Sequence, residues 1–326
     1  MPESHFIKEQ RMSQNDRFLA DRKLGRVLVT GAGGFLGAAM TNTLRAQGVD
    51  VLATDIGLVS RQRTDIAHCE VTDSEQVDAV VRQGKFDTIL HCGAVSGPMV
   101  MPDRPLDIWR INVGGTAAVL EAARRHSVGR VIICSTSEVY GKLSGPVDEA
   151  TPIATHTVYG ASKVAGEQVM LGYVKEHGVD AIALRLSWIY GPGRQTPTTL
   201  EQLVRAAHSG QRFAVLTPTD AYTHYLHITD AVEGLLRAAK TRAPQSRIIN
   251  ITAGRGLEMS EVARFVMELH PDMVVTCAPP HPEARGISEL RNHLAATEIG
   301  FIAKTPLEVG VRQLFHHFST SSENQQ

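Results

Sequence analysis

The sequence predicts an α/β fold in which helices cover both faces of a doubly wound parallel sheet. Short apolar runs rich in β-branched residues alternate with longer amphipathic stretches, as in right-handed strand–helix–strand units. A glycine-rich turn, Gly31–Gly37, separates the first apolar run from the first amphipathic stretch. Hydrophobic residues make up 43% of the 326 residues and charged residues 21%, which is the balance of an ordinary globular protein.

The apolar runs with β-branched residues are expected to form the strands. In chain order these runs are 26–30, 49–55, 68–71, 88–94, 130–137, 180–191 and 247–252. The stretches with apolar residues at helical spacing are expected to form the helices. In chain order these are 35–47, 74–84, 107–127 and 159–178. The last helix is expected to end at Gly178, because glycine commonly caps a helix C-terminus.

The strand–helix pattern loosens after Gly191, where prolines become frequent. We therefore expect a second, smaller lobe in the C-terminal part of the chain. The predicted divisions are a disordered extension at 1–24, a sheet domain at 25–191 completed by residues near 225–255, a substrate lobe mainly at 192–318, and a frayed tail at 319–326.

Charge and composition exclude several classes of partner. The formal net charge is -1 and aromatic residues are 5%, so neither nucleic acid nor an anionic membrane surface is expected as a partner. No run approaches the ~20 apolar residues of a membrane span, and the first ~24 residues lack the apolar stretch of a secretory signal. The four cysteines, Cys69, Cys92, Cys134 and Cys277, form no Cys-x-x-Cys motif. Free thiols in a reducing cytoplasm are the expectation.

The glycine-rich turn follows a predicted strand and opens a predicted helix. In such a turn Gly31 allows the tight bend, Gly34 lets the backbone approach a pyrophosphate, and Gly37 lets helix and strand pack closely. The helix N-terminus adds unpaired N–H groups and a positive dipole end. The context therefore predicts a dinucleotide-binding, Rossmann-type fold.

Asp55 ends the second predicted strand, where a carboxylate binds the adenosine ribose diol. It would repel a 2′-phosphate, which favours NAD over NADP. Two alternatives are open: Asp55 is a strand-end turn residue, or Arg61 and Arg63 accommodate a 2′-phosphate.

Tyr159 and Lys163 are four residues apart on a predicted helix and therefore share a face. A nearby ammonium and the positive nicotinamide ring favour the phenolate. Tyr159 can then take a hydroxyl proton while a hydride leaves the carbinol carbon. Thr136, at the end of the fifth predicted strand, can hydrogen-bond the same oxygen. We expect Thr136, Tyr159 and Lys163 to be the catalytic group.

Seven motifs are similar to those of one family: TGAGGFLG (30–37), HCGA (91–94), INVGGT (111–116), STSEVYG (135–141), YGASK (159–163), LRLSWIYGPG (184–193) and YLHITD (225–230). Together they resemble the extended short-chain dehydrogenase/reductase family of NAD-dependent sugar epimerases and dehydratases. The resemblance runs from about Arg26 to Ala253.

The resemblance implies an NAD-dependent enzyme, and it implies roles for further residues. Asn112 is expected to order the cofactor region, and members commonly dimerise through the helices at 107–127 and 159–178. The full expected cofactor site is Gly31, Gly34, Phe35, Leu36, Gly37, Asp55, Ile56, Val71, Cys92, Gly93, Ala94, Asn112, Tyr159 and Lys163. The expected substrate contacts are Ser96, Thr136, Trp188 and His227.

The chain departs from the family pattern at three positions. No arginine stands near Tyr222 and Thr223, where nucleotide-sugar members carry a diphosphate clamp. Trp188 replaces the usual asparagine, and Val158 replaces the usual proline. The first two departures favour a smaller polyhydroxy substrate, such as a free sugar or sugar acid. Trp188 can also simply fill core or pocket volume.

Glu138, in contrast, favours a nucleotide-sugar substrate. Thr136–Glu138 resembles the triplet of nucleotide-sugar dehydratases and UDP-glucuronate decarboxylases, in which a carboxylate can remove a proton beside a transient ketone. A polar residue at the mouth of a cleft is the equally weighted alternative.

Three functional hypotheses remain. The leading one is NAD-dependent hydride transfer at a secondary hydroxyl of a sugar, sugar acid or related polyol, with a slight preference for a dehydrogenase. The second is a nucleotide-sugar epimerase, or a dehydratase or decarboxylase using Glu138. The third, from another class, is a non-catalytic NAD(H)-binding regulator. No metal is expected, because the histidines match no metal-site spacing. These are His68, His91, His156, His224 and His227.

Overall fold

The computed structural model describes residues 22–57, 63–95, 97, 100–270 and 272–323. Its centre is a seven-stranded sheet in which every neighbouring pair is parallel. Across the sheet the strands are β12 (Ile248–Ile251), β7 (Ala181–Leu186), β5 (Arg130–Thr136), β4 (Thr88–His91), β1 (Val27–Thr30), β2 (Val51–Asp55) and β3 (Ala67–His68). The predicted fold class is confirmed. The chain order reverses between β1 and β4, and open α/β sheets bind ligands at the carboxyl ends of strands at such a point.

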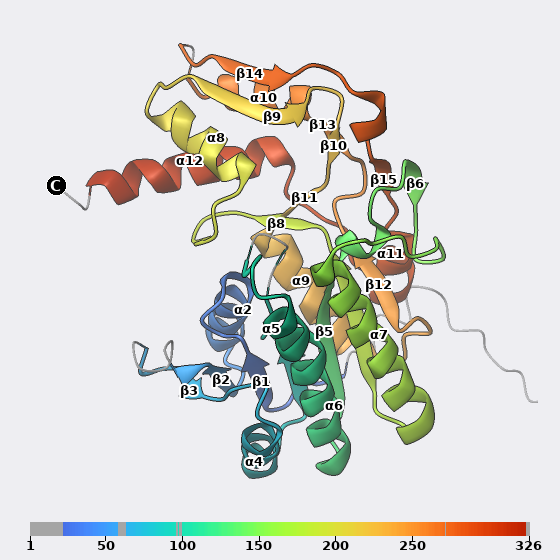
Figure 1. Cartoon of the computed structure of the whole chain (residues 1–326). Coiled ribbons are helices and arrows are strands. Elements are labelled where there is room, and N and C mark those ends of the chain that lie inside the picture. Colours follow the sequence, from blue (N-terminus) through green and yellow to red (C-terminus); the bar gives the residue numbers. More distant parts are fainter. Residues whose placement is uncertain (1–21, 58–62, 96, 98–99, 271, 324–326) are drawn as a thin grey trace, which may run out of the picture.

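Helices cover both faces of this sheet. One face packs against α2 (Phe35–Ala46), α9 (Ile228–Lys240) and α11 (His293–Ile299). The other packs against α4 (Ser74–Gly84), α6 (Gly115–Arg125) and α7 (Val158–His177), of which α6 and α7 lie in front of the sheet in Figure 1. The cap of α7 is as predicted: Gly178 is left-handed, with φ 68°.

The long helix predicted at 107–127 is divided into three parts. It consists of α5 (Pro105–Trp109), a π-helical turn (Arg110–Gly114) and α6. A π-helical turn is rare and often occurs at functional sites. Here it contains Asn112, whose side chain is buried against the loop after β4.

The strand predicted at 180–191 is interrupted at Ser187. β7 stays in the sheet, whereas β8 (Trp188–Tyr190) leaves it and pairs with β11 (Tyr225–His227). The third strand also differs from the expectation, since it is Ala67–His68 rather than 68–71.

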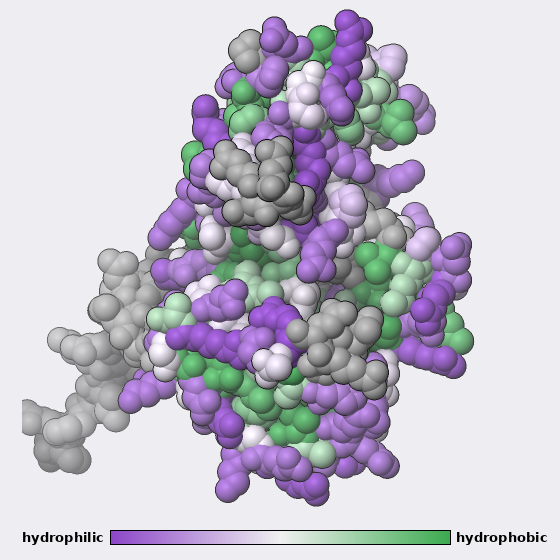
Figure 2. All heavy atoms as spheres, turned by 90° about the vertical axis from the view of Figure 1, so that its left-hand side faces the viewer, coloured by the Kyte–Doolittle hydropathy of each residue, from purple (hydrophilic) through white to green (hydrophobic). Residues whose placement is uncertain are grey.

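A smaller lobe stands above the carboxyl ends of the strands (Figure 1). Its apolar core joins α8, α10 and α12 to the β9–β14 pair. The elements are α8 (Thr199–His208), β9 (Phe213–Pro218), α10 (Met259–Met267), β14 (Val275–Ala278) and α12 (Leu307–Glu323). Short pairs complete it: β10 (Tyr222–Thr223) with β13 (Leu257–Glu258), and β15 (Ile287–Leu290) with β6 (Gly145–Val147). On the face shown in Figure 2, hydrophilic residues (purple) are frequent along the outer edges of the molecule, and hydrophobic residues (green) and paler residues appear near its middle.

The ends of the described chain are packed further than expected. The Arg22 guanidinium donates hydrogen bonds to Thr88 and to the Ala239 carbonyl, and Leu24 is buried. Arg22 and Leu24, at the end of the expected extension, therefore pack against the sheet domain, and residues 1–21 lie outside the described part. The expected frayed tail is helical as far as Glu323. None of the described helices has the length and apolar character needed to cross a bilayer.

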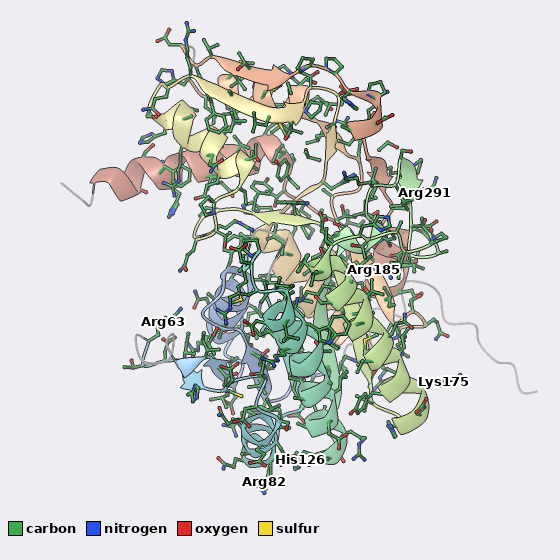
Figure 3. All side chains as sticks on the ribbon, in the orientation of Figure 1. Arg63, Arg82, His126, Lys175, Arg185 and Arg291 are labelled. Carbon is green, nitrogen blue, oxygen red and sulfur yellow. The ribbon has the colours of Figure 1, made fainter. Side chains whose placement is uncertain are left out.

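A buried ion pair connects β7 to α7 behind the carboxyl ends of the strands. The Arg185 guanidinium bonds both Glu167 carboxylate oxygens at 2.7 and 2.9 Å, and the two side chains are 3% and 0% exposed. Ser135 donates to the same carboxylate, and Arg185 also donates to the Tyr140 hydroxyl. Figure 3 shows Arg185 beside the upper part of α7, far from Lys175 at its lower end. The network fixes the helix that carries Tyr159 against the sheet.

Replacing Arg185 by methionine is expected to lower the free energy of unfolding by about 3–5 kcal/mol, because the Glu167 carboxylate would stay buried without its cation. Denaturant unfolding monitored by circular dichroism measures the change. Arg264→Met is the matched control, since its pair with Glu268 is exposed (58% and 47%). That control is expected to change stability by less than about 1 kcal/mol. Equal losses in both variants would contradict the prediction.

Candidate active site

Two connected clefts lie between the lobes. The first, about 260 Å³, is lined by the glycine-rich turn, the ends of β4 and β5, and Tyr159 and Lys163 of α7. The second, about 640 Å³, is lined mainly by the smaller lobe. Three residues line both clefts: Ser137, Glu138 and Trp188. A molecule reaching from one cleft into the other would pass these side chains.

The glycine-rich turn leaves room at only one of its three key glycines. A Cβ on Gly31, which has φ 67°, would lie 2.6 Å from the Gly93 Cα, and one on Gly37 would lie 2.1 Å from the Gly31 carbonyl oxygen. A Cβ on Gly34 would come no closer than 3.3 Å to this oxygen. The protein's own backbone thus requires Gly31 and Gly37, whereas Gly34 borders open cleft. No side chain caps the N-terminus of α2 at Gly34, which leaves N–H groups for an anion.

Asp55 is held at the end of β2 by two backbone donors. The Gly33 N–H donates to its Oδ2 at 2.8 Å, and the Ile56 N–H donates to its Oδ1 at 2.7 Å. Asp55 therefore connects strand end and glycine-rich turn, as a residue beside an adenosine ribose would. Ile56 is 41% exposed at the adjacent position.

The other expected cofactor residues divide into lining and supporting residues. Phe35, Leu36, Cys92 and Ala94 line the smaller cleft. Val71 and Gly93 are buried beneath it. Ser96 lies outside the described residues.

Asn112 supports the cleft from behind. Its Oδ1 accepts from the Val95 N–H at 2.8 Å, and its Nδ2 donates to the Ser162 Oγ at 2.9 Å. Ser162 directly precedes Lys163. One buried amide therefore links the loop after β4 to the helix bearing the expected catalytic pair.

Thr136, Tyr159 and Lys163 converge in the smaller cleft. Tyr159 is 8% exposed, and burial raises its pKa to about 12, although a hydrogen bond with Thr136 opposes the shift. The Lys163 ammonium lies 6.0 Å from the Tyr159 ring centre and donates to the Cys134 carbonyl at 2.9 Å. Burial lowers the pKa of Lys163. A cationic ligand beside the ring would oppose the shift in the Tyr159 pKa that burial causes.

Glu138 and Trp188 form a polar pair where the clefts meet. Burial raises the pKa of Glu138, and a hydrogen bond from the Trp188 indole opposes the shift. Trp188 is 38% exposed and lines both clefts, so it does not fill the core.

His227 stands at the N-terminus of α9. It lies outside the residues lining the two clefts, and it caps α9 through its Nδ1, which accepts from the Thr229 N–H. Its ring packs edge-on against Tyr190, with centroids 5.3 Å apart. The substrate contact expected at His227 therefore stays a prediction.

Several cleft residues were missed by sequence reasoning. Arg194 lines the smaller cleft, lies over the Phe35 ring at 5.8 Å and donates to the Ile189 carbonyl. It directly follows the LRLSWIYGPG motif, which is the signal that could have revealed it. The described lining of the larger cleft also contains residues brought from distant parts of the chain. These include Lys142, Thr198, Thr217, His224, His281 and Glu283.

The comparisons with known proteins agree with this geometry. A model of the NAD dependent epimerase/dehydratase family matches residues 27–252. A UDP-glucose 4-epimerase of Streptomyces lividans is 29% identical over 270 residues, which are 76% of this chain and 82% of that protein. A dTDP-glucose 4,6-dehydratase of Streptomyces griseus is 29% identical over 262 residues, which are 74% and 77% of the two chains. The solved structure of MoeE5 in complex with UDP-glucuronic acid and NAD is similar with a TM-score of 0.80 at 25% identity, and it covers 91% of this chain and 100% of that one.

Proposed function

Because the chain belongs to the NAD-dependent epimerase/dehydratase family, we propose that its clefts catalyse hydride transfer at a secondary hydroxyl of a sugar, sugar acid or related polyol. The chain is an NAD-dependent enzyme of this family. The observation that carries the proposal is the convergence of Thr136, Tyr159 and Lys163 with the glycine-rich turn in one cleft. That convergence also favours catalysis over a regulator that only binds NAD(H).

The residues of the smaller cleft, together with Asp55 at the end of β2, fit NAD. The uncapped N-terminus of α2 and the open side of Gly34 suit a pyrophosphate, and the Asp55 carboxylate beside the glycine-rich turn suits a ribose diol. When bound, NAD supplies the hydride acceptor and a positive ring. Tyr159 then removes the substrate's hydroxyl proton, and Thr136 orients the same oxygen by a hydrogen bond. Lys163 holds positive charge near the phenolate.

A panel of candidate substrates tests this proposal directly. Purified chain and NAD are mixed with sugars, aldonates, uronates and nucleoside-diphosphate sugars while NADH absorbance is followed. Stoichiometric NADH with one compound establishes a dehydrogenase and its substrate class. An altered sugar by NMR without NADH establishes internal hydride return. Stabilisation by NAD with no turnover on any compound would instead support the regulator hypothesis.

Asp55 is proposed to select NAD over NADP. Asp55→Asn is expected to weaken NAD binding by about 10–100-fold, the range for a lost hydrogen bond to a charged group, and to narrow the preference over NADP. Dissociation constants for both dinucleotides measure the change. Asp50→Asn is the control, since Asp50 directly precedes the opposite end of β2, is 70% exposed and pairs with Arg26. An unchanged NAD/NADP ratio in Asp55→Asn would contradict the assignment.

A second candidate function uses Glu138 as an additional base. Its carboxylate lies where the two clefts meet, beside Trp188 and close enough to Tyr159 to affect its pKa. A ketone formed by hydride loss acidifies the neighbouring C–H, and a carboxylate can remove that proton. Dehydratase and decarboxylase chemistry would follow.

Glu138→Gln separates the two candidates. If the enzyme is a dehydratase, overall turnover is expected to fall by about 10²–10⁴-fold while hydride transfer to NAD in a single turnover persists. If it is a dehydrogenase, steady-state NADH formation is expected to persist. Single-turnover absorbance and product NMR provide the readouts, and loss of the hydride step itself would contradict both roles for Glu138.

The larger cleft supports the smaller-substrate hypothesis. Its described lining contains Lys142 but no arginine to clamp a diphosphate. Arg285 stacks on the nearby Tyr222 ring at 5.5 Å, yet it is paired with Glu258 and Asp220. The relatives' nucleotide-sugar substrates are the alternative that the panel decides.

We also propose a cytoplasmic homodimer. Three large apolar side chains are exposed on α5 and α7, within or directly beside the stretches 107–127 and 159–178 that the family resemblance implicates: Leu106 (59%), Trp109 (44%) and Val158 (45%). Burying such surface against a second copy would stabilise a dimer. The four cysteines are free thiols, which fits a reducing compartment. Light scattering during size-exclusion chromatography measures the mass in solution.

A further inference from the structure

Two cysteines, one directly after β4 and one in β5, lie close together in the smaller cleft. The Cys134 thiol lies 3.7 Å from the Cys92 Sγ, and both residues line the cleft. The described hydrogen bonds of the catalytic group involve the Cys134 carbonyl and neither sulfur. The proposed hydride transfer therefore gives this thiol pair no role.

The two cysteines directly follow the last residue pair of the β4–β5 register. β4 and β5 are parallel neighbours, with His91 opposite Ile133, and Cys92 and Cys134 are the next residues along. Neighbouring strands lie roughly 4.8 Å apart, and disulfides require Cα atoms about 4.4–6.8 Å apart. The backbone spacing therefore permits a bond between these sulfurs after side-chain rotation.

The surroundings of Cys134 favour its thiolate. The hydrogen bond with Cys92 lowers the pKa of Cys134, burial opposes this shift, and the nearby Lys163 ammonium adds to the lowering. Thiolates, rather than thiols, attack disulfides. The other two cysteines differ: burial raises the pKa of Cys69 to about 11, and Cys277 lies in the smaller lobe, where burial also raises its pKa.

We propose that Cys92 and Cys134 are a redox-active dithiol that low-molecular-weight disulfides oxidise to an intramolecular disulfide when the NAD cleft is open. The Cys134 thiolate attacks one sulfur of the oxidant, forms a mixed disulfide and expels the first thiolate. The Cys92 thiol then loses its proton and attacks the Cys134 sulfur, which expels the second thiolate. Two protein thiols are oxidised and one oxidant disulfide is reduced to two thiols.

Oxidation and NAD binding are expected to exclude each other. This part of the inference rests on the proposed function, since it assumes that NAD occupies the smaller cleft. Bound NAD would cover the part of the cleft in which both cysteines lie. Conversely, drawing the sulfurs from 3.7 Å to the ~2.05 Å of a disulfide rearranges the cleft lining beside Lys163. Linkage makes the two effects reciprocal.

The experiment treats the reduced full chain with oxidised glutathione, with and without NAD. Without NAD, two of the four thiols are expected to disappear, and mass spectrometry of the digest is expected to find the Cys92 and Cys134 peptides joined. At an NAD concentration 100-fold above the dissociation constant, the free fraction is about one hundredth, so oxidation is expected to slow about 100-fold. Dithiothreitol is expected to restore all four thiols.

Three variants make the result specific. Cys92→Ala and Cys134→Ala are each expected to abolish the cross-link, whereas Cys277→Ala is the matched control and is expected to retain it. Retention of all four thiols without NAD, or a cross-link to Cys69 or Cys277 instead, would overturn the proposal. A cross-link that forms equally fast with bound NAD would overturn the exclusion. Failure of NAD to bind in calorimetry would count against the proposed cofactor site and leave the cross-link result intact.

Discussion

Replacing Tyr159 by phenylalanine is expected to lower kcat by about 10²–10⁴-fold, the usual contribution of a positioned acid or base. Phenylalanine fills the same space but cannot accept the substrate's proton. The hydroxyl that is lost forms a hydrogen bond with Thr136, and Tyr159 itself is buried. The variant should therefore remain folded while it loses the chemical step. Steady-state rates on the substrate found by the panel, together with the melting temperature, measure both effects.

The pH profile gives an independent signature of the same residue. Burial raises the pKa of Tyr159 to about 12, and the positive ring of bound NAD opposes this shift. Alcohol oxidation by the wild-type enzyme is therefore expected to speed up as the pH rises and the phenol loses its proton. The phenylalanine variant is expected to lack this rise.

Tyr173→Phe is the matched control for Tyr159→Phe. Tyr173 lies on the same helix, where its hydroxyl donates to Glu121 on α6, away from both clefts. Its loss is expected to leave the rate and the pH profile unchanged. A Tyr159→Phe variant with near wild-type kcat would reject Tyr159 as the base.

Replacing Gly37 by alanine is expected to cost about 3 kcal/mol of stability or more, as in severe overpacking. The added Cβ would lie 2.1 Å from the Gly31 carbonyl oxygen, which is backbone and cannot rotate away as a side chain would. To relieve the clash, α2 must move away from the turn that precedes it. Calorimetric or denaturant unfolding is expected to show the loss even without NAD.

Two other glycines serve as controls, because they distinguish the effect of a steric clash from the effect of replacing any glycine by alanine. Gly172→Ala, within α7 and with no atom within 4 Å of its Cβ, is expected to stabilise the chain by roughly 0.5–1 kcal/mol. Gly34→Ala, with 3.3 Å to its nearest neighbour, is expected to preserve the fold and to weaken NAD binding. Equal destabilisation by Gly37→Ala and Gly34→Ala would contradict the assignment of Gly37 to backbone packing and of Gly34 to the cofactor cleft.

The sequence predicted the parts of the site that depend on local spacing. Gly31, Gly34 and Gly37 act within one turn, and Tyr159 and Lys163 lie on one helix face, so neither needs knowledge of the whole fold. Their chain order with the strands also predicted the sheet, because strand–helix–strand crossovers have a fixed hand.

The contacts that the sequence did not predict depend on packing between distant segments. Arg285 reaches Tyr222 across 63 residues of sequence, and no local pattern announces that contact. His227 stands in a family motif, and its side chain accepts a hydrogen bond from the first turn of α9, a contact that the motif did not predict. The interruption at Ser187 was not predicted either, because apolar residues stand on both sides of it. In the structure β8, which follows Ser187, pairs with β11. Arg194 differs from these cases, because its position directly after a family motif could have predicted its place in the smaller cleft.

The way the chain crosses between the lobes limits how the enzyme can be recombined with its relatives. β8 leaves the sheet, α9 and β12 return to it, and the chain returns once more at α11 before α12 ends in the smaller lobe. A chimera joined at residue 191 would combine one parent's first strands with the other parent's β12 and α9, whose side chains share one apolar core with α2. Substrate range is therefore better transferred by exchanging individual loops that line the larger cleft than by exchanging a C-terminal half.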